Sequence, residues 1–532
     1  MPNLVETLPA RFAEVAYFFA GGNPQAQSSF DRRAARVQEQ AFARAELVQV
    51  LREYHRHLAS GPQTLANVEL LADERTVAVV TGQQAGFLTG PLYTLYKALT
   101  AIRLAKEQSQ RLGCPVVPVF WIASEDHDWA EVQETAVLNH EGKPVACCLP
   151  GSGGGLPVGR LPVPAWREIE PVLAAALPAT EYRAEILAAI AKFADQAGNL
   201  ADWFALTLQW LVQDRGLVFF DPLLPGLKRL AQPVYERILR AAKEIQAALQ
   251  ERTARLQELG FAPQIKPTGG EVNLFLAVPK RRALLADQDG FYLRGHSGHW
   301  SWAELSSMLA AKPECFSPNV ATRPVVQDFL LPTLAYVAGP GELSYWAQLG
   351  GVFEVLDRSM PVVYPRLSAV VLTPAWEKTL AAAGLTVADV EKGLAAYREQ
   401  KVRELDSLDI NAHFSRLRAE IRAAYAGLDP LGGLSPHVPA WIEQNLEKVE
   451  SQVQYLENKI WQAQRKASEG ALRHLQQLAD GIAPFGKKQE RVLSPLSFVA
   501  RYGLDFVAAV DGLPLRPDFA QQQIRLAGLP IS

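Results

Sequence analysis

A strand, a glycine-rich loop, a helix and a second strand follow one another between residues 76 and 122, and this unit constrains the fold most. Residues 76–80 and 116–122 are apolar, strand-like runs. Pro91 suits the first position of the intervening helix. The apolar residues of that helix recur at helical spacing: Leu92, Leu95, Leu99 and Ile102. A βαβ unit of this kind builds a parallel sheet that helices cover.

The same pattern returns later in the chain. Residues 333–338 are strand-like, a Gly-Pro-Gly turn and a helical segment follow, and a short strand at 362–364 ends at Arg366. About two hundred residues that do not repeat this pattern separate the two halves. They include a short β segment near 272–278 and a strand-like segment, 216–221, which is a candidate to rejoin the core sheet. We therefore predict a split α/β core that carries a large insertion.

From residue 374 to 480 the sequence is almost wholly helical. Apolar residues there alternate spacings of three and four, which is typical of a coiled-coil seam. The seam comprises Leu446, Val449, Val453, Leu456, Ile460, Ala463 and Ala467. Segment 385–426 is a candidate antiparallel partner, because the prolines and glycines of 427–440 supply a turn. The sequence leaves open whether such a hairpin pairs within one chain or between two.

Composition narrows the classes of partner. The 532 residues include 53 basic and 56 acidic ones, with no dense run of one sign, so nothing indicates a nucleic-acid or anionic-membrane partner. Glu6 and Glu14 interrupt the amino-terminal segment where a signal peptide would be basic and then apolar, and we expect a cytoplasmic protein with no membrane-spanning segment. The four cysteines form no C-x-x-C pair and are expected to be reduced, small hydrophobic residues.

Ligands of open parallel sheets bind at the carboxyl ends of the strands, near the point where the strand order reverses. Four segments follow predicted strands in this way: residues 81–90, 124–128, 339–342 and Arg366.

The first of these segments, TGQQAGFLTG, spaces Gly82, Gly86 and Gly90 four apart and fits neither common phosphate-binding fingerprint. Glycines let the backbone approach a ligand, and the N–H groups that begin the next helix favour an anion. The side chains that suit a small polar substrate are Thr81, Gln83, Gln84, Thr89, Tyr93 and Lys97. The alternative is a loop selected only for close packing of helix on sheet, from which glutamines gain nothing.

The second segment, Ser124-Glu125-Asp126-His127-Asp128, places three carboxylates and an imidazole at one strand end. They would repel one another unless a metal, a substrate ammonium group or arginines lay nearby. His127 could act as a general base that Glu125 or Asp128 orients. The alternative is that Ser124 caps a helix whose first turn takes acidic residues because they suit its dipole.

Five long segments together resemble the BshC family, the cysteine ligases of bacillithiol biosynthesis, in the same order along the chain. They are TGQQAGFLTGPLYTLYKAL (81–99), PVFWIASEDHDWAEV (118–132), RPVVQDFLLPTLAYVAGPGELSYWAQL (323–349), MPVVYPR (360–366) and GKKQERVLSPLSF (486–498).

The resemblance implies an α/β fold with a Rossmann-like parallel sheet core, inserted connective modules and a long α-helical coiled-coil domain that forms a homodimer. The domain boundaries that follow are 1–133 and 321–373 for the core halves, 134–320 for the insertions, 374–480 for the coiled coil and 481–532 for a carboxyl-terminal segment packed on the core.

The implied reaction adds cysteine to glucosaminyl malate, with ATP and Mg²⁺ activating the cysteine carboxylate, with no tightly bound cofactor and with no residue assigned as a metal ligand. On this basis residues 81–90 bind substrate or nucleotide, and an amino group or a metal meets Asp126 and its neighbours. An anionic group lies near Arg366. Further expected contacts are Gly339, Gly341, Glu342, Lys487 and Arg491.

Two functions of other classes remain open at this point. One is a non-catalytic, nucleotide-binding scaffold whose working part is the coiled coil. The other is a metal-dependent hydrolase that uses the acidic segment 124–128.

Overall fold

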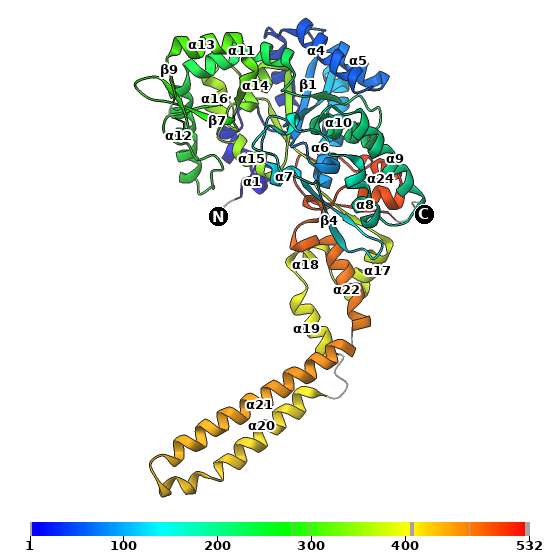
Figure 1. Ribbon diagram of the computed structural model, residues 1–532, viewed down its shortest axis with the longest axis vertical. Helices are drawn as coiled ribbons and strands as arrows, with labels where there is room; N and C mark the ends of the chain where they lie inside the picture. The colour runs from blue at the N-terminus through cyan, green and yellow to red at the C-terminus, as the bar shows by residue number, and fades with distance from the viewer. Residues whose placement is uncertain (1–2, 279, 297, 405–408, 468, 527–532) are drawn as a thin grey trace. The chain divides into compact units, whose positions relative to one another are not determined.

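The structure is a computed structural model that describes residues 3–526 except 279, 297, 405–408 and 468 (Figure 1). The chain divides into two compact units. The first comprises the residues up to Thr373 and those from Gln489 onward, and the second is Pro374–Lys488. The expected helical domain, 374–480, falls inside the second unit.

The core of the first unit is a five-stranded parallel sheet in the order β12-β11-β1-β2-β5. Its strands are β1 (Val77–Gln83), β2 (Val116–Ile122), β5 (Val218–Phe220), β11 (Thr333–Ala338) and β12 (Val362–Pro365). The chain passes from β1 through β2 to β5, then returns to β11 on the other side of β1 and continues to β12. The strand order therefore reverses between β1 and β11. The predicted parallel core is confirmed, as is the return of segment 216–221 to it.

Helices surround this sheet (Figure 1). The α-helices of the first unit are α1 (Leu4–Ala10), α2 (Phe12–Val15), α3 (Gln27–Gln38), α4 (Arg44–His57), α5 (Pro62–Leu70), α6 (Leu92–Leu112), α7 (Trp129–Val132), α8 (Trp166–Ala176), α9 (Glu181–Gln196), α10 (Leu200–Val212), α11 (Pro225–Arg240), α12 (Ala242–Glu258), α13 (Trp302–Ala311), α14 (Arg323–Leu330), α15 (Pro340–Trp346), α16 (Gly350–Val355), α23 (Leu496–Tyr502) and α24 (Asp505–Asp511). Its 3₁₀ turns are η1 (Ala16–Phe18), η2 (Phe87–Thr89), η3 (Val158–Arg160), η4 (Pro313–Cys315) and η7 (Gln489–Arg491).

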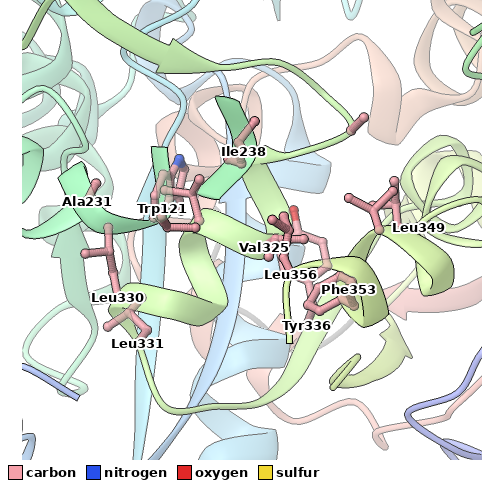
Figure 2. Packing of buried hydrophobic residues seen from close by; sticks show 14 of the residues in the cluster. Trp121, Ala231, Ile238, Val325, Leu330, Leu331, Tyr336, Leu349, Phe353 and Leu356 are labelled. Atoms are coloured by element: carbon pink, nitrogen blue, oxygen red, sulfur yellow. The ribbon is translucent and has the colours of Figure 1, made fainter. Parts of the chain in front are cut away.

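Both faces of the sheet are buried because successive side chains of a strand point to opposite faces. Val77 and Val79 of β1 belong to an apolar cluster that includes α3 and α6. Ala78 and Val80 belong to a larger cluster on the other face, part of which Figure 2 shows. In that larger cluster Trp121 is almost fully buried and stacks on Phe220 with ring centroids 4.6 Å apart. The two faces make a three-layer core that fixes the strand ends.

The insertion between the core halves contains more β structure than the sequence indicated. Apart from segment 216–221 only one β segment was predicted there, near 272–278, whereas the structure has a five-stranded antiparallel sheet in the order β10-β6-β7-β8-β9. Its strands are β6 (Glu271–Ala277), β7 (Arg281–Ala286), β8 (Phe291–Leu293), β9 (His299–Trp300) and β10 (Phe316–Pro318). Two smaller pairs are β3 (Glu134–Leu138) with β4 (Pro144–Cys148), and β13 (Ala369–Leu372) with β14 (Gln522–Arg525).

The second unit is helical. Its elements are α17 (Pro374–Ala383), α18 (Val387–Lys392), α19 (Ala395–Glu404), α20 (Ile410–Ala426), η5 (Asp429–Leu434), α21 (Val438–Ala467), α22 (Glu469–Ile482) and η6 (Pro484–Gly486). Helices α20 and α21 lie side by side (Figure 1). Arg422 pairs with Glu450 and Arg418 with Glu457, so the two helices are antiparallel. The predicted helical hairpin is confirmed, with α20 as the partner of α21.

The hairpin covers only part of the predicted seam. Val453 is buried against α20, but Leu456 is 49% exposed and Ile460 is 36% exposed. After Val453 the contact face continues four residues on, at Glu457, because an α-helix has 3.6 residues per turn. The carboxylate of Glu457 pairs with Arg418, and this pairing compensates for its burial. The side chain of Ala467 lies outside the described part of the chain.

Candidate functional site

A cavity of about 540 Å³ opens where the strand order reverses. Its walls come from residues that follow β1, β2, β11 and β12, together with residues of the inserted sheet. The four segments predicted from the sequence are thus brought together by the parallel sheet. From these segments the lining residues are Gly82, Gln83, Gln84, Glu125, Asp126, Gly339, Gly341, Glu342 and Arg366.

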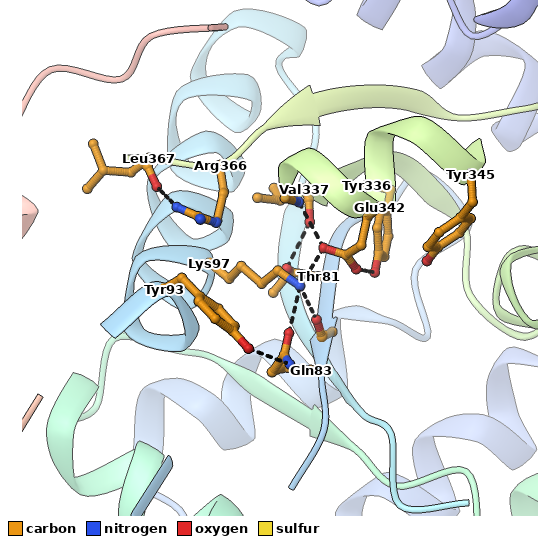
Figure 3. A network of polar contacts seen from close by, with 12 residues as sticks. Thr81, Gln83, Tyr93, Lys97, Tyr336, Val337, Glu342, Tyr345, Arg366 and Leu367 are labelled. Carbon is orange, nitrogen blue, oxygen red and sulfur yellow. Dashed lines mark hydrogen bonds and ion pairs between the residues drawn. The ribbon is translucent and has the colours of Figure 1, made fainter. Parts of the chain in front are cut away.

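Lys97 of α6 organises the first wall of the cavity (Figure 3). Its Nζ donates to the Gly82 carbonyl at 2.7 Å and to Gln83 Oε1 at 3.0 Å, and lies 2.5 Å from Glu342 Oε2. Because an ammonium group has three N–H donors, all of them are used within the protein. The amide nitrogen of Gln83 donates in turn to the Tyr93 hydroxyl at 3.2 Å, so both ends of the Gln83 amide are held. Lys97 therefore positions polar groups of the site rather than presenting a free charge.

Glu342 of α15 joins this network from the opposite wall (Figure 3). Its carboxylate accepts hydrogen bonds from the Tyr336 hydroxyl at 2.6 Å and from the Gly339 N–H at 2.8 Å. Burial alone would raise the pKa of Glu342, but Lys97 and these two donors together lower it. Glu342 is therefore held as a carboxylate.

The second half of the glycine-rich loop lies away from the cavity lining. Leu88, Thr89 and Gly90 have φ values of 51°, 69° and 68°, so the loop makes a tight left-handed turn. A Cβ on Gly86 would lie 3.2 Å from the Gly90 Cα, and Gly90 combines φ 68° with ψ −152°, a backbone conformation that favours glycine. Thr81 donates across the sheet to the Val337 carbonyl at 2.9 Å. At Thr81, Gly86, Thr89 and Gly90 the structure shows packing contacts, and ligand contact there stays a prediction.

The acidic segment after β2 divides between the cavity and the surface. Glu125 is buried and its carboxylate contacts the Nζ of buried Lys228, a residue of α11. Asp126 accepts from Gln84 Nε2 at 2.9 Å and lies 3.7 Å from Arg281. Burial raises the pKa of Asp126 against the opposing effect of Arg281. The cations that the acidic residues were expected to need are thus Lys228 and Arg281.

His127 and Asp128 are exposed and are not among the lining residues of the cavity. His127 Nδ1 lies 3.2 Å from Arg281 Nη1, so this nitrogen acts as an acceptor. Asp128 caps α7 and accepts from the Glu131 N–H at 3.3 Å. The capping alternative is wrong for Ser124, because its hydroxyl donates to Asp221 and the helix begins only at Trp129, after the acidic residues. Catalytic roles for His127 and Asp128 stay predictions.

Arg366 lines the cavity, but its positive charge is neutralised by Glu490. It is 1% exposed, and its guanidinium forms a two-point pair with Glu490 at 2.8 and 3.2 Å. Burial would raise the pKa of Glu490, but Arg366 and the hydrogen bonds from Ser368 and Ala369 together lower it. Arg491, one residue on, is exposed and lines the cavity. Lys487 belongs to the second unit.

The sequence reading missed two arginines of the cavity. Arg281 begins β7 and stacks on the Phe275 ring, with its guanidinium carbon 3.8 Å from the ring centroid. Arg323 begins α14 and donates to the Tyr345 hydroxyl and to Gln327 Oε1, each at 3.1 Å. The available signals were weak: a Lys-Arg-Arg triplet after an apolar strand, and an Arg-Pro pair before a helix.

Over the described ranges of the chain, no three His, Cys, Asp or Glu side chains come together as ligands for a metal ion. No described helix is long and apolar enough to cross a membrane.

Fold and site first define a class: an α/β protein with a Rossmann-like parallel sheet, a polar cavity at its switch point and a separate helical coiled-coil unit. Two family models match the chain. Residues 2–367 match the N-terminal Rossmann-like domain of the bacillithiol biosynthesis protein BshC, and residues 369–526 match its C-terminal coiled-coil domain. The chain belongs to the BshC family.

Curated relatives agree with this assignment. The chain is 38% identical over 520 residues to a Symbiobacterium thermophilum protein named "Putative cysteine ligase BshC". The aligned region covers 94% of this chain and 93% of the relative. It is 34% identical over 512 residues to a protein of the same name from Geobacillus thermodenitrificans, with the same covered shares. The predicted family and its function, a cysteine ligase of bacillithiol biosynthesis, are confirmed.

A crystal structure of a Campylobacter jejuni protein also matches, with a TM-score of 0.24 and 11% identity over 89% of this chain and 99% of the other. A likeness this low carries no argument.

Proposed function

We propose that this cavity joins the carboxyl group of cysteine to the amino group of glucosaminyl malate, with ATP and Mg²⁺ as co-substrates. The observation that carries the proposal is the cavity itself, which gathers both acidic and basic side chains at the carboxyl ends of four parallel strands. Family membership supplies the class of reaction.

Amide formation needs a group that takes a proton from the attacking ammonium. Asp126 is suited to this role because it lines the cavity, its side chain is 42% exposed and its pKa is raised by burial. Gln84 fixes one carboxylate oxygen of Asp126, which orients the other. His127 is the competing candidate because it shares Arg281 with Asp126.

Activation of the cysteine carboxylate requires phosphate groups to be bound. Arg491 is exposed at the cavity, and among the described residues its guanidinium has no ion-pair partner, so it is suited to bind them. A Cβ added to Gly341 would meet no atom within 4 Å, so the backbone there is open to a ligand. Magnesium usually enters such sites with the phosphates and few protein ligands.

Reconstitution tests the proposal. Purified protein is incubated with cysteine, glucosaminyl malate, ATP and Mg²⁺, and both the thiol product and AMP or ADP are measured. Folded protein that yields no thiol product would refute the proposal. Asp126→Asn is expected to abolish product formation, and His127→Ala and Asp128→Ala test the roles predicted from sequence. Normal thiol formation by either alanine variant would remove that residue from the mechanism.

We also infer that the second unit forms a homodimer. Helix α21 exposes large apolar side chains that the hairpin itself does not cover, including Tyr455 at 59%, Leu456 at 49% and Ile460 at 36%. Such a face is typical of a protein interface. Leu456→Glu with Ile460→Glu is expected to give a monomer by light scattering with the helical content unchanged. A variant that remains dimeric would contradict the inference.

The same proposal places the reaction in the cytoplasm, where the four free cysteines would stay reduced.

A further inference from the structure

The charged side chains that line the cavity differ in whether the protein neutralises them. Three of its cations have a carboxylate within ion-pair distance: Lys97 with Glu342, Arg366 with Glu490 and Arg281 with Asp126. Arg491 is exposed, so water can solvate it. Arg323 differs from all of these, because it lies in the cavity wall and its hydrogen-bond partners among the described residues are neutral.

In the part of the chain that is described, no carboxylate lies within ion-pair distance of Arg323, and the carboxylates of Glu342 and Asp126 in the same cavity act on it only from farther away. One Nη donates to Gln327 and the other to the Tyr345 hydroxyl. The guanidinium carbon lies 5.5 Å from the Tyr336 ring centroid and 6.0 Å from that of Trp121. A guanidinium has five N–H donors, and these two hydrogen bonds use only two of them. The remaining donors are available to a ligand.

Holding such a charge partly buried and without a paired carboxylate is costly. The cost is offset when a ligand supplies the anion, and a carboxylate matches the fork of a guanidinium with two parallel hydrogen bonds. The hydrogen bonds to Gln327 and to the Tyr345 hydroxyl hold both Nη atoms of Arg323, so the fork is in place before the ligand arrives.

We propose that Arg323 is a specificity-determining residue that binds a carboxylate of the malyl group of glucosaminyl malate. The inference rests on the proposed function and adds the orientation of the substrate. With the malyl group at Arg323, the glucosamine amino group is directed toward Asp126, which lines the same cavity.

The chemistry of the reaction favours the malyl carboxylates over the carboxylate of cysteine. The cysteine carboxylate is consumed: its carbon loses one oxygen and forms the amide bond. A tight two-point pair with that group would stabilise the ground state and oppose the reaction. The malyl carboxylates are unchanged throughout, so binding them costs nothing at the reacting centre.

Binding measurements test the inference on the full-length protein. L-malate, cysteine, ATP and glucosaminyl malate are titrated separately by calorimetry into wild type, Arg323→Gln and Arg323→Lys. Arg323→Gln is expected to weaken the binding of malate and of glucosaminyl malate by about 10- to 100-fold, because a hydrogen-bonded charge is lost. Arg323→Lys keeps the charge but loses the fork, so an intermediate loss is expected. Cysteine and ATP should bind as in wild type.

The matched control is Arg237→Gln, which removes an exposed arginine that lies over the Phe329 ring and does not line the cavity. If Arg323→Gln fails to fold, Tyr345→Phe removes the hydroxyl that holds Arg323. This variant is expected to weaken the binding of malate by a smaller factor and to leave the binding of cysteine and ATP unchanged. Malate that binds Arg323→Gln as tightly as wild type would overturn the inference. So would wild type that binds no malate, or an equal loss for cysteine or ATP.

The reconstitution separates this inference from the proposed function. Malate binding that depends on Arg323, without any thiol product, would refute the ligation step and leave the carboxylate site standing. In an active enzyme, Arg323→Gln is expected to raise KM for glucosaminyl malate far more than it lowers kcat.

Discussion

The buried pair of Arg366 and Glu490 gives a prediction whose size follows from the structure. Both residues are at most 3% exposed. The carboxylate of Glu490 accepts from both Nη atoms of Arg366, from the Ser368 hydroxyl at 3.0 Å and from the Ala369 N–H at 3.1 Å. Glu490→Gln keeps the shape but leaves the guanidinium buried without a counter-charge. We expect it to lower the free energy of unfolding of the first unit by about 3–5 kcal/mol.

A double-mutant cycle measures this coupling. Glu490→Gln, Arg366→Met and the double variant are compared by urea unfolding, with amide hydrogen exchange in β12 as the probe of the first unit. Each single change leaves one buried charge unpaired, whereas the double change removes both. The double variant should therefore be several kcal/mol more stable than the sum of the two single effects predicts.

The control for this cycle is the exposed pair of Arg52 and Glu69, which has the same two-point geometry with both contacts at 2.6 Å. Water solvates these charges when they separate, so Glu69→Gln is expected to change stability little. The reasoning would be refuted if Glu490→Gln cost no more than Glu69→Gln, or if the two single effects in the buried pair were additive.

Two further predictions concern ionisable groups near the cavity. Burial raises the pKa of Asp221 to about 6, so its contribution to stability is present below about pH 4 and is lost as the pH rises through 6. The melting temperature of Asp221→Asn relative to wild type should therefore rise between about pH 4 and pH 8. The exposed Asp289→Asn variant should show no such rise. Lys97→Met should lower kcat/KM by about 100-fold or more because it releases Gln83 and Glu342 together, and near-normal activity would contradict that positioning role.

Local sequence patterns were sufficient for the core strands and the helical hairpin. The βαβ unit from β1 to β2 was predictable because side-chain periodicity depends only on near neighbours. The inserted antiparallel sheet was not, because β7 mixes arginines with apolar residues and β8 and β9 are only three and two residues long. At Leu456 and Ile460 the spacing alone did not determine which face of α21 meets α20.

The sequence by itself also located the cavity, since strand ends of a parallel sheet share one edge and the order reverses there. It did not decide which charged groups of that cavity are free. Arg366 is neutralised by a residue 124 positions away, and Glu125 by one 103 positions away. Arg323 has no such partner among the described residues. Only the tertiary structure shows this, because ion pairs depend on distances in space, whereas strand and helix patterns depend on neighbours along the chain.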